Sequence, residues 1–159
     1  MLPINQVAPD FTLPVFGGGE SHFYGKESKT GVLIFYKFSC PTCQLAIPFL
    51  QRIYDAYGNA FHFVAVAQDG PEETAKFRQE YGITIPTLMD MTPYPFSRRY
   101  DIAYVPSIFL VNQDHTIRFS GEGFVKQEML NLADALAERS GRPQIDVFGD
   151  DEVPEIKPG

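Results

Sequence analysis

Two cysteines, Cys40 and Cys43, are the residues whose type and spacing most directly indicate chemistry in this 159-residue chain, and it has no others. At the start of a helix, residues three apart lie on the same face. That placement is compatible with the Cα separation of about 5–6 Å that a disulfide prefers. The sequence therefore predicts a pair of thiols that can form and break a disulfide.

The two cysteines are expected to have different roles. Cys40 should lie at the N-terminus of a helix over residues 40–57, where unpaired amide groups and the positive end of the helix dipole favour a thiolate. Because the thiolate is the attacking species in disulfide exchange, we assign the nucleophile to Cys40. Cys43 should be less accessible and should release the product by attacking the mixed disulfide. Pro41 fixes a helical φ in the first turn, where its missing N–H costs nothing.

Two other uses of this cysteine pair are weaker. A zinc site needs two further ligands, and the three histidines, His22, His62 and His115, have no ligand-like spacing. A purely structural disulfide would close a very short loop and would constrain the unfolded chain little. We therefore expect no metal, and no cofactor other than a redox-active Cys40–Cys43 disulfide.

Composition limits the classes of partner. The net charge of −7 disfavours nucleic acid and anionic membrane surfaces, which repel an acidic protein. No apolar run approaches the roughly 20 residues of a membrane-spanning helix. Residues 1–6 lack a basic stretch followed by an apolar one, so we expect a cytoplasmic protein. A periplasmic or other extracytoplasmic location stays open if a leader has been trimmed.

The hydrophobic pattern predicts an α/β fold. Continuous apolar runs of strand length are typical of strands buried on both faces, and the longer amphipathic stretches are typical of helices. Strand, helix, strand, helix, hairpin and helix in this order imply a mixed sheet between layers of helices. The expected elements are an N-terminal hairpin at 10–16 and 21–24, strands at 32–36 and 61–67, helices at 40–57 and 71–81, a short extended piece at 86–89, a short helix at 95–100, a hairpin at 107–111 and 116–119, and a helix at 125–140.

The last 19 residues differ in character from the rest. Residues 141–159 contain three prolines and five acidic residues among seven charged ones, which is typical of a flexible tail. We therefore divide the chain into a domain over residues 1–140 and an extended acidic C-terminal tail over 141–159. Ile145, Val147 and Phe148 are the side chains that could anchor it.

Three segments resemble parts of the thioredoxin-like superfamily. Residues 8–13 resemble the opening of the redoxin branch, which the AhpC/TSA and TlpA-like groups share. Residues 35–43 resemble the active-site segment with its Cys-Pro-Thr-Cys motif, and residues 100–111 resemble the cis-proline segment. The resemblance covers roughly residues 5–140. It implies a thioredoxin-like three-layer sandwich with the cysteines at the substrate-binding edge.

The resemblance also implies a substrate-binding loop. The cis proline would be Pro106, because a strand hairpin and a final helix follow it, whereas the prolines after Pro86 exclude a central strand there. We predict a cis peptide bond at Val105–Pro106 and a trans bond at Ile85–Pro86. In the family, the residue before the cis proline pairs its backbone with the substrate. The substrate-binding residues so implied are Pro41, Thr42, Tyr104, Val105 and Pro106.

The chain departs from the family at the positions that assist the second cysteine. Ile34 and Ala46 stand where thioredoxins and TlpA-like proteins, respectively, carry an acid. A buried thiol without a base keeps a raised pKa and attacks slowly. Water, Tyr36 or Gln68 could replace the acid, and we expect slow or specialised exchange.

The function indicated is that of a thiol–disulfide oxidoreductase. Its expected partners are protein thiols and disulfides and a redox protein that donates or accepts electrons. The alternative is a peroxiredoxin-like peroxidase with an antioxidant role, in which Cys40 is oxidised to a sulfenic acid and Cys43 resolves it. Lys37 stands where the peroxidase needs a hydroxyl residue. The candidates for its arginine are Arg98, Arg99 and Arg118.

A third hypothesis is a non-enzymatic binding module that uses the same groove with an inert disulfide. Aromatic side chains could line a hydrophobic groove beside the cysteines in all three cases. The candidates are Tyr94, Phe96 and Tyr104.

Overall fold

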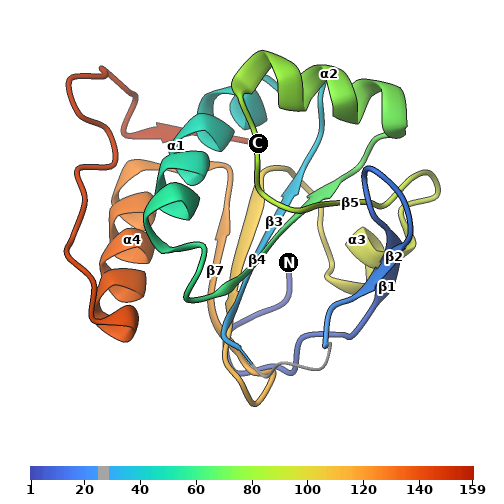
Figure 1. Ribbon diagram of the computed structural model, residues 1–159, viewed down its shortest axis with the longest axis horizontal. Helices are drawn as coiled ribbons and strands as arrows, with labels where there is room; N and C mark the ends of the chain where they lie inside the picture. The colour runs from blue at the N-terminus through green and yellow to red at the C-terminus, as the bar shows by residue number, and fades with distance from the viewer. Residues whose placement is uncertain (25–28) are drawn as a thin grey trace.

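A five-stranded mixed sheet forms the centre of the protein, whose computed structural model describes residues 1–24 and 29–159 (Figure 1). The strand order is β5-β4-β3-β6-β7. The elements are, in chain order, β1 (Thr12–Pro14), β2 (Glu20–His22), β3 (Gly31–Tyr36), α1 (Pro41–Tyr57), β4 (His62–Ala67), α2 (Pro71–Tyr81), β5 (Thr87–Met89), α3 (Pro95–Arg99), β6 (Ser107–Val111), β7 (Ile117–Glu122), β8 (Phe124–Val125), α4 (Lys126–Ser140) and β9 (Ile156–Lys157).

The central strand β3 is buried along its whole length, as its continuous apolar sequence predicts. It pairs in parallel with β4 and antiparallel with β6. Side chains alternate between the faces of a strand, so Ile34 and Tyr36 pack with α1, α2 and α4, whereas Leu33 and Phe35 pack with the N-terminal arm and Tyr100. The predicted three-layer α/β sandwich is confirmed.

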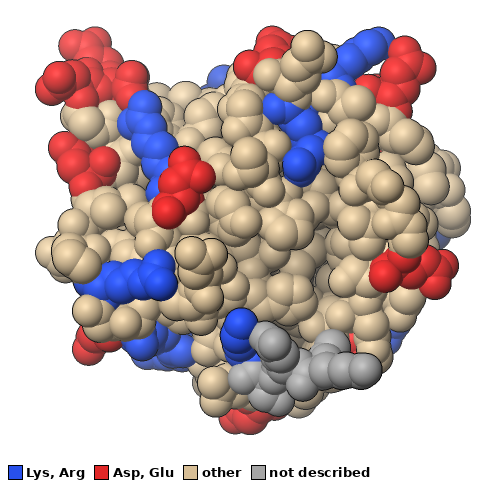
Figure 2. All heavy atoms as spheres, in the orientation of Figure 1, with Lys and Arg blue, Asp and Glu red and all other residues tan. Residues whose placement is uncertain are grey.

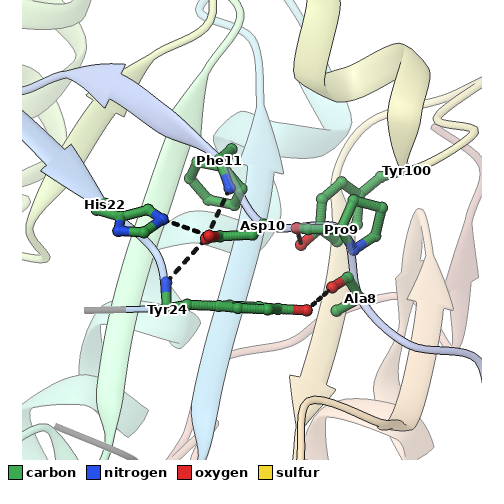
Figure 3. A network of polar contacts seen from close by, with 7 residues as sticks. All are labelled: Ala8, Pro9, Asp10, Phe11, His22, Tyr24 and Tyr100. Atoms are coloured by element: carbon green, nitrogen blue, oxygen red, sulfur yellow. Dashed lines mark hydrogen bonds and ion pairs between the residues drawn. The ribbon is translucent and has the colours of Figure 1, made fainter. Parts of the chain in front are cut away.

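The N-terminal arm and hairpin are fixed by a cluster around Asp10 (Figure 3). One carboxylate oxygen accepts hydrogen bonds from the backbone N–H groups of Phe11 at 2.8 Å and Tyr24 at 3.0 Å, and the other pairs with His22. The Tyr100 hydroxyl donates to the backbone of the arm. These contacts hold the arm and the β1–β2 hairpin against Tyr100 at the end of α3.

The helix boundaries and the key peptide bonds agree with the sequence-based predictions, whereas β8 and β9 were not predicted and β7 is longer than the expected strand over 116–119. α1 ends at Gly58, and α2 ends at Gly82, whose left-handed φ of 63° suits glycine. The Val105–Pro106 bond is cis and the Ile85–Pro86 bond is trans, as predicted. A second cis bond, Thr92–Pro93, was not predicted.

Residues 141–159, the C-terminal segment, do not form a flexible tail, and that prediction is wrong. The three expected anchors are confirmed: Val147 and Phe148 are buried, and Ile145 packs against the same core at partial exposure. β9 pairs antiparallel with β8, and Figure 1 shows the segment running back past α4 and α1. Burial of these apolar side chains therefore holds the segment on the core, despite its many prolines and acidic residues.

The surface of the protein carries charges of both signs. Acidic side chains gather at the corner of the molecule where the C-terminal segment turns (Figure 2). Within residues 1–24 and 29–159, no helix combines the length and the apolar character that a membrane span requires.

Candidate active site

Cys40 lies at the N-terminus of α1 and is partly exposed, whereas Cys43 is fully buried. The Cys40 sulfur caps the helix, accepting a hydrogen bond from the Cys43 backbone N–H at 3.3 Å. Its thiol donates to the Val105 carbonyl at 3.2 Å. The geometry therefore brings together the predicted nucleophile, the second cysteine and the cis-proline loop.

The second thiol has a strongly perturbed environment. Burial raises the pKa of Cys43 far above its ordinary value, and a backbone contact from Lys37 offsets only part of this. The negative charge of Asp69 raises the pKa further. Cys43 therefore resists ionisation until a proton acceptor takes its proton.

Asp69 is the acid that the sequence analysis missed. It follows β4 and accepts a hydrogen bond from the Phe38 backbone N–H at 2.7 Å, just before Cys40. Burial raises its pKa above the usual aspartate value. Asp69 is partly buried, and a carboxylate with a raised pKa is a better proton acceptor than one with an ordinary pKa. It comes from the strand beside β3, so no spacing rule around the cysteines could have found it.

Tyr36 and Gln68, which the sequence analysis considered as substitutes for the missing acid, lie in different environments from that of Asp69. Tyr36 is buried, and burial raises the pKa of its phenol. The Gln68 side-chain amide donates to the Ser97 hydroxyl at 2.9 Å, which ties the end of β4 to α3.

A groove beside the cysteines is lined by aromatic residues. Tyr94 and Tyr104 line a cavity of about 240 Å³ that ends at Val105. Tyr94 also borders a second cavity of about 430 Å³ together with Lys37, whose ammonium donates to the Tyr94 hydroxyl at 3.2 Å. Phe96 packs on Phe11 in the core instead, so its expected place in the groove is wrong.

The residues expected to bind substrate lie together around Cys40, but they are not equally open. Pro41 and Tyr104 are exposed and Val105 is partly buried, whereas Pro106 is buried. Thr42 is only 3% exposed, and its hydroxyl donates to the Pro158 carbonyl of the C-terminal segment at 2.5 Å. The structure thus places the chain itself where Thr42 was expected to meet a substrate.

The three arginines considered for a peroxidase site lie in different parts of the structure. Arg98 lines the 240 Å³ cavity, Arg99 stacks on Phe96 at 5.6 Å, and Arg118 lines a separate cavity beside α4. Of these three arginines, Arg98 shares its cavity with Val105, whose carbonyl accepts a hydrogen bond from Cys40. Within the described ranges, no group of three or more His, Cys, Asp or Glu side chains is arranged to hold a metal ion.

Comparison with known proteins agrees with this geometry. Residues 4–120 match the AhpC/TSA family, and the chain belongs to that family. It is 24% identical over 132 residues to the methylamine utilization protein MauD of Paracoccus versutus, covering 83% of this chain and 65% of MauD. It is also 24% identical over 117 residues to the thiol–disulfide oxidoreductase ResA of Geobacillus kaustophilus, covering 72% of this chain and 67% of ResA.

The solved structures show the same fold. A candidate protein disulfide isomerase of Bacteroides thetaiotaomicron superposes with a TM-score of 0.81 at 18% identity, covering 89% of this chain and 92% of that one. The thioredoxin-like redoxin assignment made from the sequence is therefore confirmed. The chain spans about two-thirds of the length of MauD and ResA.

Proposed function

We propose that this protein is a thiol–disulfide oxidoreductase that exchanges disulfides with protein substrates through Cys40 and Cys43. The observation that carries the proposal is the pairing of an accessible sulfur at a helix N-terminus with a buried thiol one turn away. The ResA relative, which is named for the same activity, supports it.

The geometry suits a two-step exchange. In the first step, the Cys40 thiolate attacks a substrate disulfide, so a mixed disulfide forms and one substrate thiolate leaves. In the second step, Cys43 loses its proton and attacks the Cys40 sulfur, which releases the second substrate thiolate and leaves a Cys40–Cys43 disulfide. The substrate is reduced by two electrons and the protein is oxidised by two. A redox partner restores the dithiol, and the same steps in reverse oxidise a substrate dithiol.

Replacing each cysteine tests the assignment of roles. Cys40→Ser should abolish turnover of a disulfide substrate, whereas Cys43→Ser should accumulate a mixed disulfide at Cys40 that mass spectrometry detects. If the Cys40→Ser protein accumulated a mixed disulfide at Cys43 and the Cys43→Ser protein accumulated none at Cys40, the roles of the two cysteines would be reversed.

A peroxidase is the second candidate, because the family match is to AhpC/TSA. Against it, Lys37 occupies the place of the required hydroxyl residue and donates to Tyr94. Stopped-flow oxidation of Cys40 by hydrogen peroxide decides between them: a thiol–disulfide oxidoreductase should react at the rate of an ordinary thiol.

The compartment stays a prediction. The sequence leaves a cytoplasmic and an extracytoplasmic location open, and cell fractionation of the full-length natural protein distinguishes them.

A further inference from the structure

The C-terminal segment is held in place well before it reaches the active site. Phe148 packs edge-on against Phe49 with ring centroids 4.9 Å apart. The Arg52 guanidinium donates to the carbonyls of Val147 at 3.0 Å and Phe148 at 3.2 Å, and it pairs with Asp151 at 2.7 Å. These contacts fix the point from which the chain turns towards the cysteines.

The segment then adds a strand beside α1. In the β8–β9 ladder Phe124 lies opposite Lys157 and Val125 lies opposite Ile156. The Lys126 backbone N–H donates to the Glu155 carbonyl at 2.9 Å, and their side chains form an ion pair at 3.3 Å. This pairing uses the backbone hydrogen-bonding groups at the edge of β8, to which an extended polypeptide could otherwise bind.

Beyond β9 the chain lies directly on the cis-proline loop. Pro158 accepts the hydrogen bond from Thr42, and a Cβ added at Gly159 would lie 2.6 Å from the Val105 carbonyl oxygen. Gly123 permits this approach: its φ is 73°, and a Cβ there would lie 2.8 Å from the Lys157 carbonyl. The same Val105 carbonyl accepts from Cys40, so residues 156–159 end beside the nucleophile.

We propose that residues 156–159 are a self-docked competitor for polypeptide substrates, which must displace them to bind along β8 and reach Cys40. This inference rests on the proposed function. Small disulfides reach the partly exposed sulfur past Tyr104 without that displacement. The protein therefore discriminates between substrates by whether they need the groove that its own chain occupies.

The displacement lowers the apparent affinity for polypeptides in proportion to the fraction of molecules with an open groove. A groove that is open in about a tenth of the molecules weakens binding about tenfold. At that open fraction, releasing the segment raises kcat/KM for a polypeptide disulfide about tenfold and leaves that for a small disulfide unchanged.

The ladder provides a matched pair of substitutions in the full chain. Opposite residues in an antiparallel ladder alternate between hydrogen-bonded and non-bonded pairs. Because Lys126 bonds to Glu155, the next bonded pair is Phe124 with Lys157. Lys157→Pro therefore removes a ladder donor, whereas the control Ile156→Pro alters a position whose N–H faces outward and whose side chain is 67% exposed.

The test compares kcat/KM for insulin with that for hydroxyethyl disulfide in the three proteins. Lys157→Pro should raise the insulin value about tenfold and Ile156→Pro should change it less than twofold, with the small disulfide unaffected. An equal or lower insulin rate in Lys157→Pro would overturn the self-docked competitor. A parent protein that reduces neither substrate would instead refute the proposed function.

Hydrogen exchange provides a second measurement that needs no change in the segment. In the Cys43→Ser protein, a mixed disulfide between Cys40 and an insulin chain should accelerate exchange at the amide of Lys157. A mixed disulfide with mercaptoethanol should leave it protected. Equal protection in the two adducts would show that polypeptides bind without displacing the segment, contrary to the proposal.

Discussion

Replacing Phe148 by alanine should detach the C-terminal segment and destabilise the protein. Phe148 is 5% exposed, and its ring lies 4.9 Å from that of Phe49 and 6.1 Å from that of Phe124. Truncating a buried phenylalanine to alanine costs about 3–5 kcal/mol, as lost transfer free energy and a residual cavity.

Thermal and urea unfolding measure this loss. At this chain length, 1 kcal/mol corresponds to about 2–4 °C in Tm, so Phe148→Ala should lower Tm by roughly 10 °C. The control is Ile156→Ala in the same segment, which removes a largely exposed side chain and should change stability by less than about 0.5 kcal/mol. A loss below about 1 kcal/mol in Phe148→Ala would refute the reasoning, because the main anchor would then contribute little more than an exposed residue.

The remaining predictions concern the second thiol and the support of α3. Because burial raises the pKa of Cys43, stopped-flow release of a mixed disulfide in the Asp69→Asn protein, which lacks the proton acceptor, should accelerate about tenfold per pH unit between about pH 6 and 9. Asp69→Asn should slow this release roughly tenfold at neutral pH without changing attack by Cys40. Faster release would mean that Asp69 acts only as a charge opposing the thiolate. Asp90→Ala should cost about 1–3 kcal/mol in urea unfolding, because the buried carboxylate accepts from the Ser97 N–H and hydroxyl, each at 2.7 Å, and no change would contradict this.

Local signals in the sequence were sufficient for most of the fold. The apolar run over residues 32–36 indicates a strand buried on both faces, and β3 has that burial. Pro41 and Gly58 mark the limits of α1 through constraints that act within one turn. The choice of Pro106 over Pro86 as the cis proline depended on which elements follow each proline, and the structure agrees.

The features that the sequence did not reveal depend on contacts between distant residues. Asp69 reaches the backbone before Cys40 because β4 pairs in parallel with β3, although the two residues are far apart in the chain. The docking of the C-terminal segment depends on Arg52 and Phe49 of α1, about 100 residues earlier. Composition indicated a solvated tail, and although the sequence analysis named the anchors Ile145, Val147 and Phe148, it could not locate the surface of α1 that receives them.

The position of Thr42 connects these observations to specificity. In the Cys-Pro-Thr-Cys motif, the sequence predicts that the threonine contacts substrate, yet its hydroxyl bonds to Pro158 and is shielded from solvent. A polypeptide must replace that hydrogen bond as well as the β8 pairing, whereas a small disulfide needs neither. Since Cys40 stays partly exposed in the docked state, the segment leaves the chemistry of the nucleophile accessible and acts on which substrates can bind beside it.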